Sequence, residues 1–117
     1  MAFKKIINIE TFNTKVEVLI TNNIQNEIKK IYNSYSDEYA DPIEVEGILI
    51  NLNTEKYHLL IDTQYLSHNT IAHEIYHAAV RITEDRDVVD EETQAWLCGY
   101  ITQKVYDFIK LKKLEIK

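Results

Sequence analysis

A stripe of apolar residues in the second half of the chain is the feature that most constrains the fold. Ile71, Ile75, Ala78 and Ile82 recur every three or four residues, which predicts an amphipathic helix from Tyr65 or Ser67 to Thr83. At about 100° per residue, the histidines at 73 and 77 project almost opposite this stripe. One face of the helix is therefore expected to pack on a sheet, while the other presents two imidazoles.

The remaining elements follow from strand and helix periodicities and from capping residues. We expect strands at 6–9 and 15–20, a helix over 23–36, a break at Asp41-Pro42, strands at 45–52 and 57–62, and a last helix that Asp90 caps. This order, β-β-α-β-β-α-α, predicts an α+β fold with a small mixed sheet packed against two long helices.

Composition limits the classes of protein to which the chain can belong. Its 117 residues fit one domain, 1–117, with a modest core. The formal charge of −6 argues against binding to nucleic acid or to an anionic membrane, because both need a basic face. A single cysteine, Cys98, excludes an internal disulfide, and no apolar leader follows the two lysines near the N-terminus. We therefore expect a cytoplasmic protein.

The segment His73-Glu74-Ile75-Tyr76-His77 matches the pattern H-E-x-x-H within the predicted helix. Residues i and i+4 lie one above the other on a helix face, so both imidazoles can bind one ion. Glu74 then flanks the ion without ligating it, where it can take a proton from a water that the metal activates. The pattern predicts a catalytic metal site with Glu74 as general base. Two solvated histidines on a helix surface are the alternative.

A catalytic zinc site usually has three protein ligands, so a third is needed from elsewhere. Glu92 lies in the first turn of the last predicted helix and shares a face with the small residues Ala95 and Gly99. Small residues would let this helix approach the histidine helix closely, so we assign Glu92 as the third ligand. Glu91 is the rival, and both glutamates could instead only balance the helix dipole.

These segments resemble the gluzincins, zinc metallopeptidases that bind their metal with two histidines and a glutamate. The closer resemblance is to the small metallopeptidase-like proteins of phages and prophages, and it covers residues 71–101. It implies Zn²⁺, a minimal zincin-like fold and narrow-specificity hydrolysis of a peptide or protein substrate. Larger gluzincins carry subdomains that supply an oxyanion donor, for which this chain has no room. Tyr76 and Tyr100 are the candidates for that role.

Two alternatives to a hydrolase stay open at this point. A zincin scaffold without turnover would be a metal-binding or structural protein of phage origin, and a helical packing module would bind no metal. In zincins the substrate lies along a sheet edge near the metal. Either 45–52 or 57–62 could provide that edge by strand addition. His68 and His58 are expected to have surface and packing roles.

Overall fold

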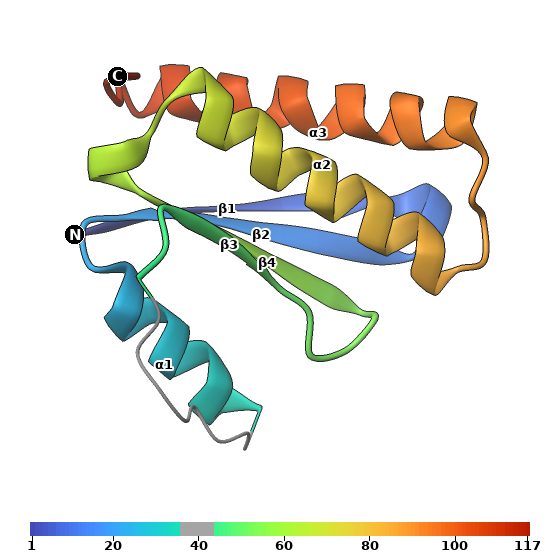
Figure 1. Ribbon diagram of the computed structural model, residues 1–117, viewed down its shortest axis with the longest axis horizontal. Helices are drawn as coiled ribbons and strands as arrows, with labels where there is room; N and C mark the ends of the chain where they lie inside the picture. Colours follow the sequence, from blue (N-terminus) through green and yellow to red (C-terminus); the bar gives the residue numbers. More distant parts are fainter. Residues whose placement is uncertain (36–43) are drawn as a thin grey trace.

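The computed structural model describes residues 1–35 and 44–117, which form one four-stranded sheet and three α-helices (Figure 1). The strands lie in the order β1-β2-β4-β3, with β2 and β4 parallel and the two outer pairs antiparallel. The predicted α+β class and the order of elements are confirmed. In chain order the bounds are β1 Ala2–Ile9, β2 Thr14–Thr21, α1 Ile24–Ser34, β3 Gly47–Ile50, β4 Lys56–Asp62, α2 His68–Asp85 and α3 Glu91–Leu111.

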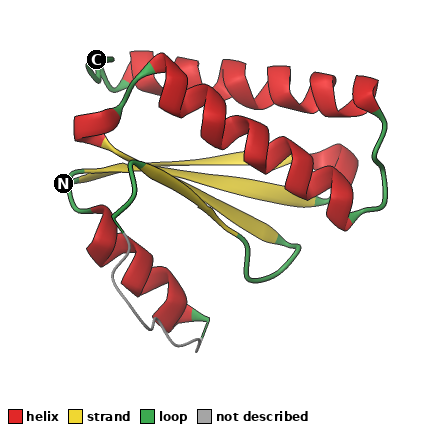
Figure 2. Cartoon of the chain, viewed as in Figure 1, coloured by secondary structure: helices red, strands yellow, loops and turns green. Residues whose placement is uncertain are grey.

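The sheet separates two layers of helices (Figure 2). Helices α2 and α3 cover one face, while α1 lies on the other. Side chains alternate along each strand, so Val18 joins the larger core under α2 and α3, and the next residue, Leu19, joins the smaller core under α1. The sheet is therefore buried on both sides at its centre, where most residues of β2 and β4 are buried, polar ones such as Glu17 and His58 included.

Each helix begins at a polar residue that the sequence marks as a cap. The side chains of Asn23, Ser67 and Asp90 accept hydrogen bonds from backbone amides three residues ahead, at 3.3, 3.1 and 3.0 Å. The hydrogen bonds from the hydroxyl and then the backbone amide of Thr93 also lower the pKa of the Asp90 carboxyl. Local sequence thus fixes where α1, α2 and α3 start.

The strand boundaries differ more from expectation than the helix boundaries do. Strand β1 is longer than the predicted 6–9, because it pairs with β2 along its whole length, from Ala2 opposite Thr21 to Ile9 opposite Thr14. Strand β3 is shorter than the predicted 45–52. The expected break at Asp41-Pro42 lies outside the described residues. No helix in the described part of the chain is both long and apolar enough to cross a membrane.

Candidate metal centre on helix α2

Helix α2 presents two chemically different faces. The stripe Ile71, Ile75, Ala78 and Ile82 is fully buried against the sheet, as its spacing predicts. His73 and His77 lie on the exposed side of the same helix. Burial of the stripe holds the helix in place, so the orientation of the two imidazoles is set by the packing behind them.

The two imidazoles converge on one point. Their Nε2 atoms are 3.0 Å apart, and the rings meet edge to face with centroids 4.6 Å apart. Two nitrogens that bind one tetrahedral zinc at 2.0–2.1 Å lie about 3.3 Å from each other. The two Nε2 atoms therefore need to move only slightly farther apart for His73 and His77 to bind a single divalent ion.

Glu74 lies beside this pair but points into the protein. It is only 6% exposed, and burial raises the pKa of its carboxyl above the ordinary value, while the nearby His73 and His77 partly offset the rise. Among the described residues, none donates a hydrogen bond to this carboxylate. A buried carboxylate with a raised pKa and two adjacent imidazoles has the properties of a general base and acid.

The space that Glu74 occupies depends on Gly47, the first residue of β3. A β-carbon added at Gly47 would lie 2.9 Å from Glu74 Cγ and 3.2 Å from Glu74 Oε2. It would also lie 3.1 Å from the backbone oxygen of Leu60 on the neighbouring strand. Only glycine permits this close approach of strand and carboxylate, so the start of β3 and the candidate base fit together.

A hollow of about 240 Å³ opens between the start of β3 and the first turns of α2. His73 and Glu74 line it from the helix, and Gly47 lines it from the strand. Strand β3 is the outer strand on this side of the sheet, while β4 lies between β2 and β3. Of the two strands that could border the metal site, only β3 has an edge without a neighbouring strand among residues 1–35 and 44–117.

Glu92, the predicted third ligand, lies elsewhere. Its side chain is exposed in the first turn of α3 and borders a shallow hollow with Thr11, Thr93 and Trp96. Glu91 is exposed as well. Within residues 1–35 and 44–117, no three His, Cys, Asp or Glu side chains gather closely enough to hold a metal ion. The structure thus brings His73 and His77 together without bringing either glutamate to them.

The antiparallel packing of α2 and α3 explains this placement. Gln94 donates to the hydroxyl of Thr83 at 3.1 Å at one end, and His68 pairs with the Tyr106 hydroxyl at 2.7 Å at the other. The first turn of α3 therefore lies near the C-terminal end of α2. That end is eight residues beyond His77, or about 12 Å along the helix axis.

The expectation that Ala95 and Gly99 face α2, on which the preference for Glu92 over Glu91 rests, is wrong. Both residues are exposed, and a β-carbon built on Gly99 meets nothing within 4 Å. The face of α3 that packs on the core instead carries larger apolar residues, among them Leu97, Ile101 and Val105. The small residues Ala95 and Gly99 therefore lie on the solvent-exposed side of α3. The assignment of Glu92 as a metal ligand stays a prediction.

The two tyrosines considered as oxyanion donors are also placed by the structure. Tyr76 is on α2 and is 62% exposed. The Tyr100 hydroxyl donates to the backbone oxygen of Asn8 at 3.2 Å, on β1. Since β1 and β3 are opposite edges of the sheet, Tyr100 lies far from the hollow beside His73.

Sequence reasoning missed a second cluster of polar residues, on the α1 face of the sheet. His58 on β4 contacts Glu17 on β2 through Nδ1 at 3.1 Å and the hydroxyl of Tyr35 through Nε2 at 2.9 Å. Lys56 adds an ion pair to Glu17 at 2.9 Å. The sequence does carry a signal for this cluster: Glu17 and His58 each lie between apolar residues of a predicted strand, and a titratable residue buried there needs a partner.

The two shifted pKa values in this cluster follow from its geometry. Burial opposes ionisation of Glu17, but the hydrogen bonds from Lys56 and His58 and the charges of Lys56 and Lys4 outweigh it and lower the pKa of Glu17. Burial lowers the pKa of His58, and Glu17 only partly offsets this. The cluster therefore favours an ionised glutamate beside a neutral imidazole.

Comparison of the chain with protein-family models, with curated proteins and with solved structures finds no match in any of the three.

Proposed function

We propose that this chain is a zinc-dependent metallopeptidase-like hydrolase with narrow peptide specificity, of the kind found as small phage and prophage proteins. The observation that carries the proposal is the pair of Nε2 atoms 3.0 Å apart on the exposed face of α2, with the buried carboxylate of Glu74 beside it. Residues four apart lie near each other on any helix, but two histidines with only a surface role would not need a buried carboxylate between them.

The residues divide the work by position. His73 and His77 hold the ion, which when bound would polarise the scissile carbonyl and lower the pKa of a water. Glu74 takes the proton of the attacking water and passes it to the leaving amine. Its raised pKa suits this exchange, because a carboxyl with an ordinary pKa holds a proton too weakly to deliver it near neutral pH.

The free edge of β3 supports a peptide substrate. An extended segment that adds to β3 as a further strand would run past the hollow that His73 and Glu74 line. Main-chain pairing would give affinity with little demand on side chains, and the hollow would select the residue next to the scissile bond. We place the substrate there rather than along β4, which has neighbours on both sides.

In this proposal Glu92 completes the ligand set, with Glu91 as the alternative, and the first turn of α3 has to move from its place near the C-terminal end of α2 toward His77 for either to bind. Zinc titration of Glu92→Gln and Glu91→Gln variants separates the two, because loss of a ligand weakens binding sharply while loss of a dipole partner does not. If both variants bind zinc as tightly as the parent chain, neither glutamate is a ligand.

The proposal is tested by zinc content and peptide cleavage measured on the same preparations. The parent chain should carry one zinc per chain and cleave members of a peptide library. Glu74→Gln should keep the zinc and lose cleavage by about 10²–10⁴-fold, and His73→Ala should lose both. Undiminished cleavage by Glu74→Gln would rule out the mechanism.

A non-catalytic metal-binding protein on the same scaffold is the second candidate. The outward placement of Glu92 and the engagement of Tyr100 with β1 favour it. It predicts bound zinc with no cleavage of any library peptide by the parent chain, which distinguishes it from the hydrolase.

A further inference from the structure

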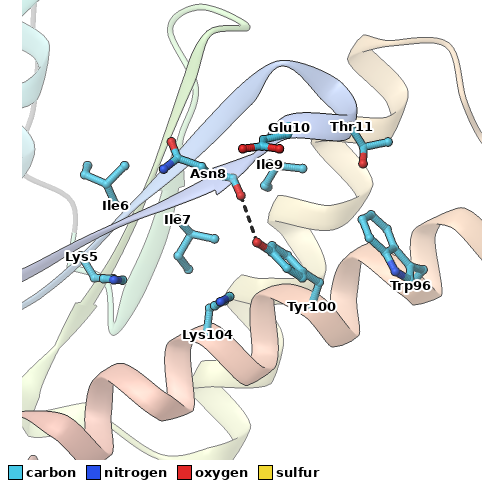
Figure 3. A pocket seen from close by; sticks show the side chains of 10 residues that line it. All are labelled: Lys5, Ile6, Ile7, Asn8, Ile9, Glu10, Thr11, Trp96, Tyr100 and Lys104. Atoms are coloured by element: carbon cyan, nitrogen blue, oxygen red, sulfur yellow. Dashed lines mark hydrogen bonds between the residues drawn. The ribbon is translucent and has the colours of Figure 1, made fainter.

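A hollow of about 420 Å³ lies at the β1 edge of the sheet, the edge opposite β3 (Figure 3). Its floor is the outer strand β1, from Lys5 to the turn at Thr11, and its wall is α3. Three side chains of α3 spaced one turn apart, Trp96, Tyr100 and Lys104, reach from the helix toward the strand. This groove, defined by these residues, belongs to neither the metal centre nor the β3 edge.

Main-chain groups of β1 face this groove. The Met1 backbone oxygen accepts from the amide of Asn22 beyond the end of β2, so the polar groups of residue 1 turn toward β2. Because direction alternates along a strand, those of Lys4, Ile6 and Asn8 turn outward. The bond from Tyr100 to the Asn8 oxygen agrees with this alternation. Strand β1 thus presents a pairing edge to any strand that enters the groove.

The three side chains of the wall, Trp96, Tyr100 and Lys104, change from aromatic to cationic along α3, and we call them the ladder. Trp96 stacks on Tyr100 with centroids 5.7 Å apart, and the Lys104 ammonium lies 5.6 Å from the centre of the Tyr100 ring. Trp96 remains 51% exposed, so its indole offers apolar surface to a ligand in the groove. Lys5 adds a second cation from the strand side, against the single acid Glu10.

We propose that this groove binds an extended peptide segment of a partner protein, one that places a carboxylate and an apolar side chain two residues apart on the same face. The segment adds to β1 as a fifth strand. Its carboxylate lies between Lys5 and Lys104, and its apolar residue packs on Trp96 and Tyr100. Side chains two residues apart on a strand are about 6.8 Å apart, close to the rise of about 6 Å between successive members of the ladder.

Charge argues for such a partner over a second copy of this chain. Pairing of two β1 strands would bring Lys4 and Lys5 of each copy near the same lysines of the other, and lysines on an edge strand oppose self-pairing. An acidic segment meets complementary charge instead. The proposal does not depend on the metal centre, so it stands or falls separately.

A synthetic peptide that repeats Thr-Asp-Thr-Val, acetylated and amidated, is the probe. We expect saturable binding by fluorescence anisotropy, with the amide signals of Lys4, Ile6 and Asn8 shifting in the NMR spectrum. Lys104→Glu should weaken binding by about tenfold or more, and Trp96→Ala should also weaken it. Lys29→Glu, the same charge change on α1, should leave binding unchanged.

Two N-methylated versions of the peptide test strand addition without altering the protein. Methyl groups on the amides that face β1 should abolish binding, while methyl groups on the opposite amides should leave it intact. Lack of saturable binding at millimolar peptide, equal binding to Lys104→Glu, or signal changes confined to β3 would overturn the proposal. So would a dimer that forms through the β1 amides and excludes the peptide.

Discussion

Two glutamates are buried to the same extent on opposite faces of the sheet, yet they behave in opposite ways. Glu17 and Glu74 are each 6% exposed. The pKa of Glu17 is lowered because Lys56 and His58 bind its carboxylate, whereas the pKa of Glu74 is raised because burial acts on it without a hydrogen bond from the described residues. Burial alone therefore does not determine the state of a carboxyl group. Glu17 links β2 to β4 through its ionised carboxylate, whereas the carboxyl of Glu74 gains and loses a proton more readily near neutral pH.

The largest difference should appear when each glutamate is neutralised. Glu17→Gln should lower the free energy of unfolding at pH 7 by about 2 kcal/mol, because it removes the partner of Lys56 and weakens the bond to His58. Glu74→Gln should leave stability unchanged or slightly raised, because it removes a charge that burial disfavours. Urea unfolding of the two variants measures both effects. An equal loss of unfolding free energy in both would show that Glu17 and Glu74 do not differ in their contribution to stability.

The fit of Glu74 against β3 can be tested with an added methyl group. Gly47→Ala should cost about 1–2 kcal/mol of stability, since its β-carbon would crowd both Glu74 and the backbone oxygen of Leu60. It should also reduce peptide cleavage while zinc binding persists. Gly99→Ala is the matched control. That site is open and helical, so alanine there should stabilise the protein slightly.

A smaller change should follow from loss of one hydroxyl in the Glu17 cluster. Tyr35→Phe leaves His58 Nε2 without its partner and should lower stability by about 1 kcal/mol. Tyr76→Phe alters a tyrosine that is mostly exposed and should have no measurable effect on unfolding. Equal stability of Tyr35→Phe and the parent chain would show that the hydrogen bond to His58 contributes nothing.

The finest test is the direction in which stability changes with pH. His58 has a lowered pKa when folded, so the unfolded chain binds its proton first, and stability falls as pH drops below about 6.5. Glu17 adds a further loss below about 4.3, as pH falls toward its lowered folded pKa. Glu74 acts in the opposite sense, because its raised pKa adds stability as pH falls.

Chemical unfolding of the parent chain at pH 7.5 and 5.5, beside His58→Asn, isolates the first of these contributions. The parent chain should lose more stability on acidification than the variant. If the two lose the same amount, His58 is not held neutral by the fold.

What the sequence predicts well in this protein is local. The stripe from Ile71 to Ile82 and the cap at Asp90 depend on neighbours within one or two helical turns, so the helices are found almost in full. The convergence of His73 and His77 has the same origin, since residues four apart meet on any helix.

What could not be predicted depends on register between distant segments. Glu17 meets His58 only because β2 and β4 pair in parallel with these two residues opposite each other. The β3 edge and the contact of Gly47 with Glu74 likewise arise from strand order. The misplaced face of α3 has the same cause, because the side on which two helices pack is decided by the whole core.

The local origin of the histidine pair has a consequence for how zinc affects folding. An unfolded chain that forms α2 transiently already presents both imidazoles, so it can bind the metal before the sheet exists. Zinc affinity shared with the unfolded state does not stabilise the folded one. A shift in melting temperature on adding zinc would then understate the affinity. Occupied metal in a preparation would also be no sign that Glu74 had reached its buried position.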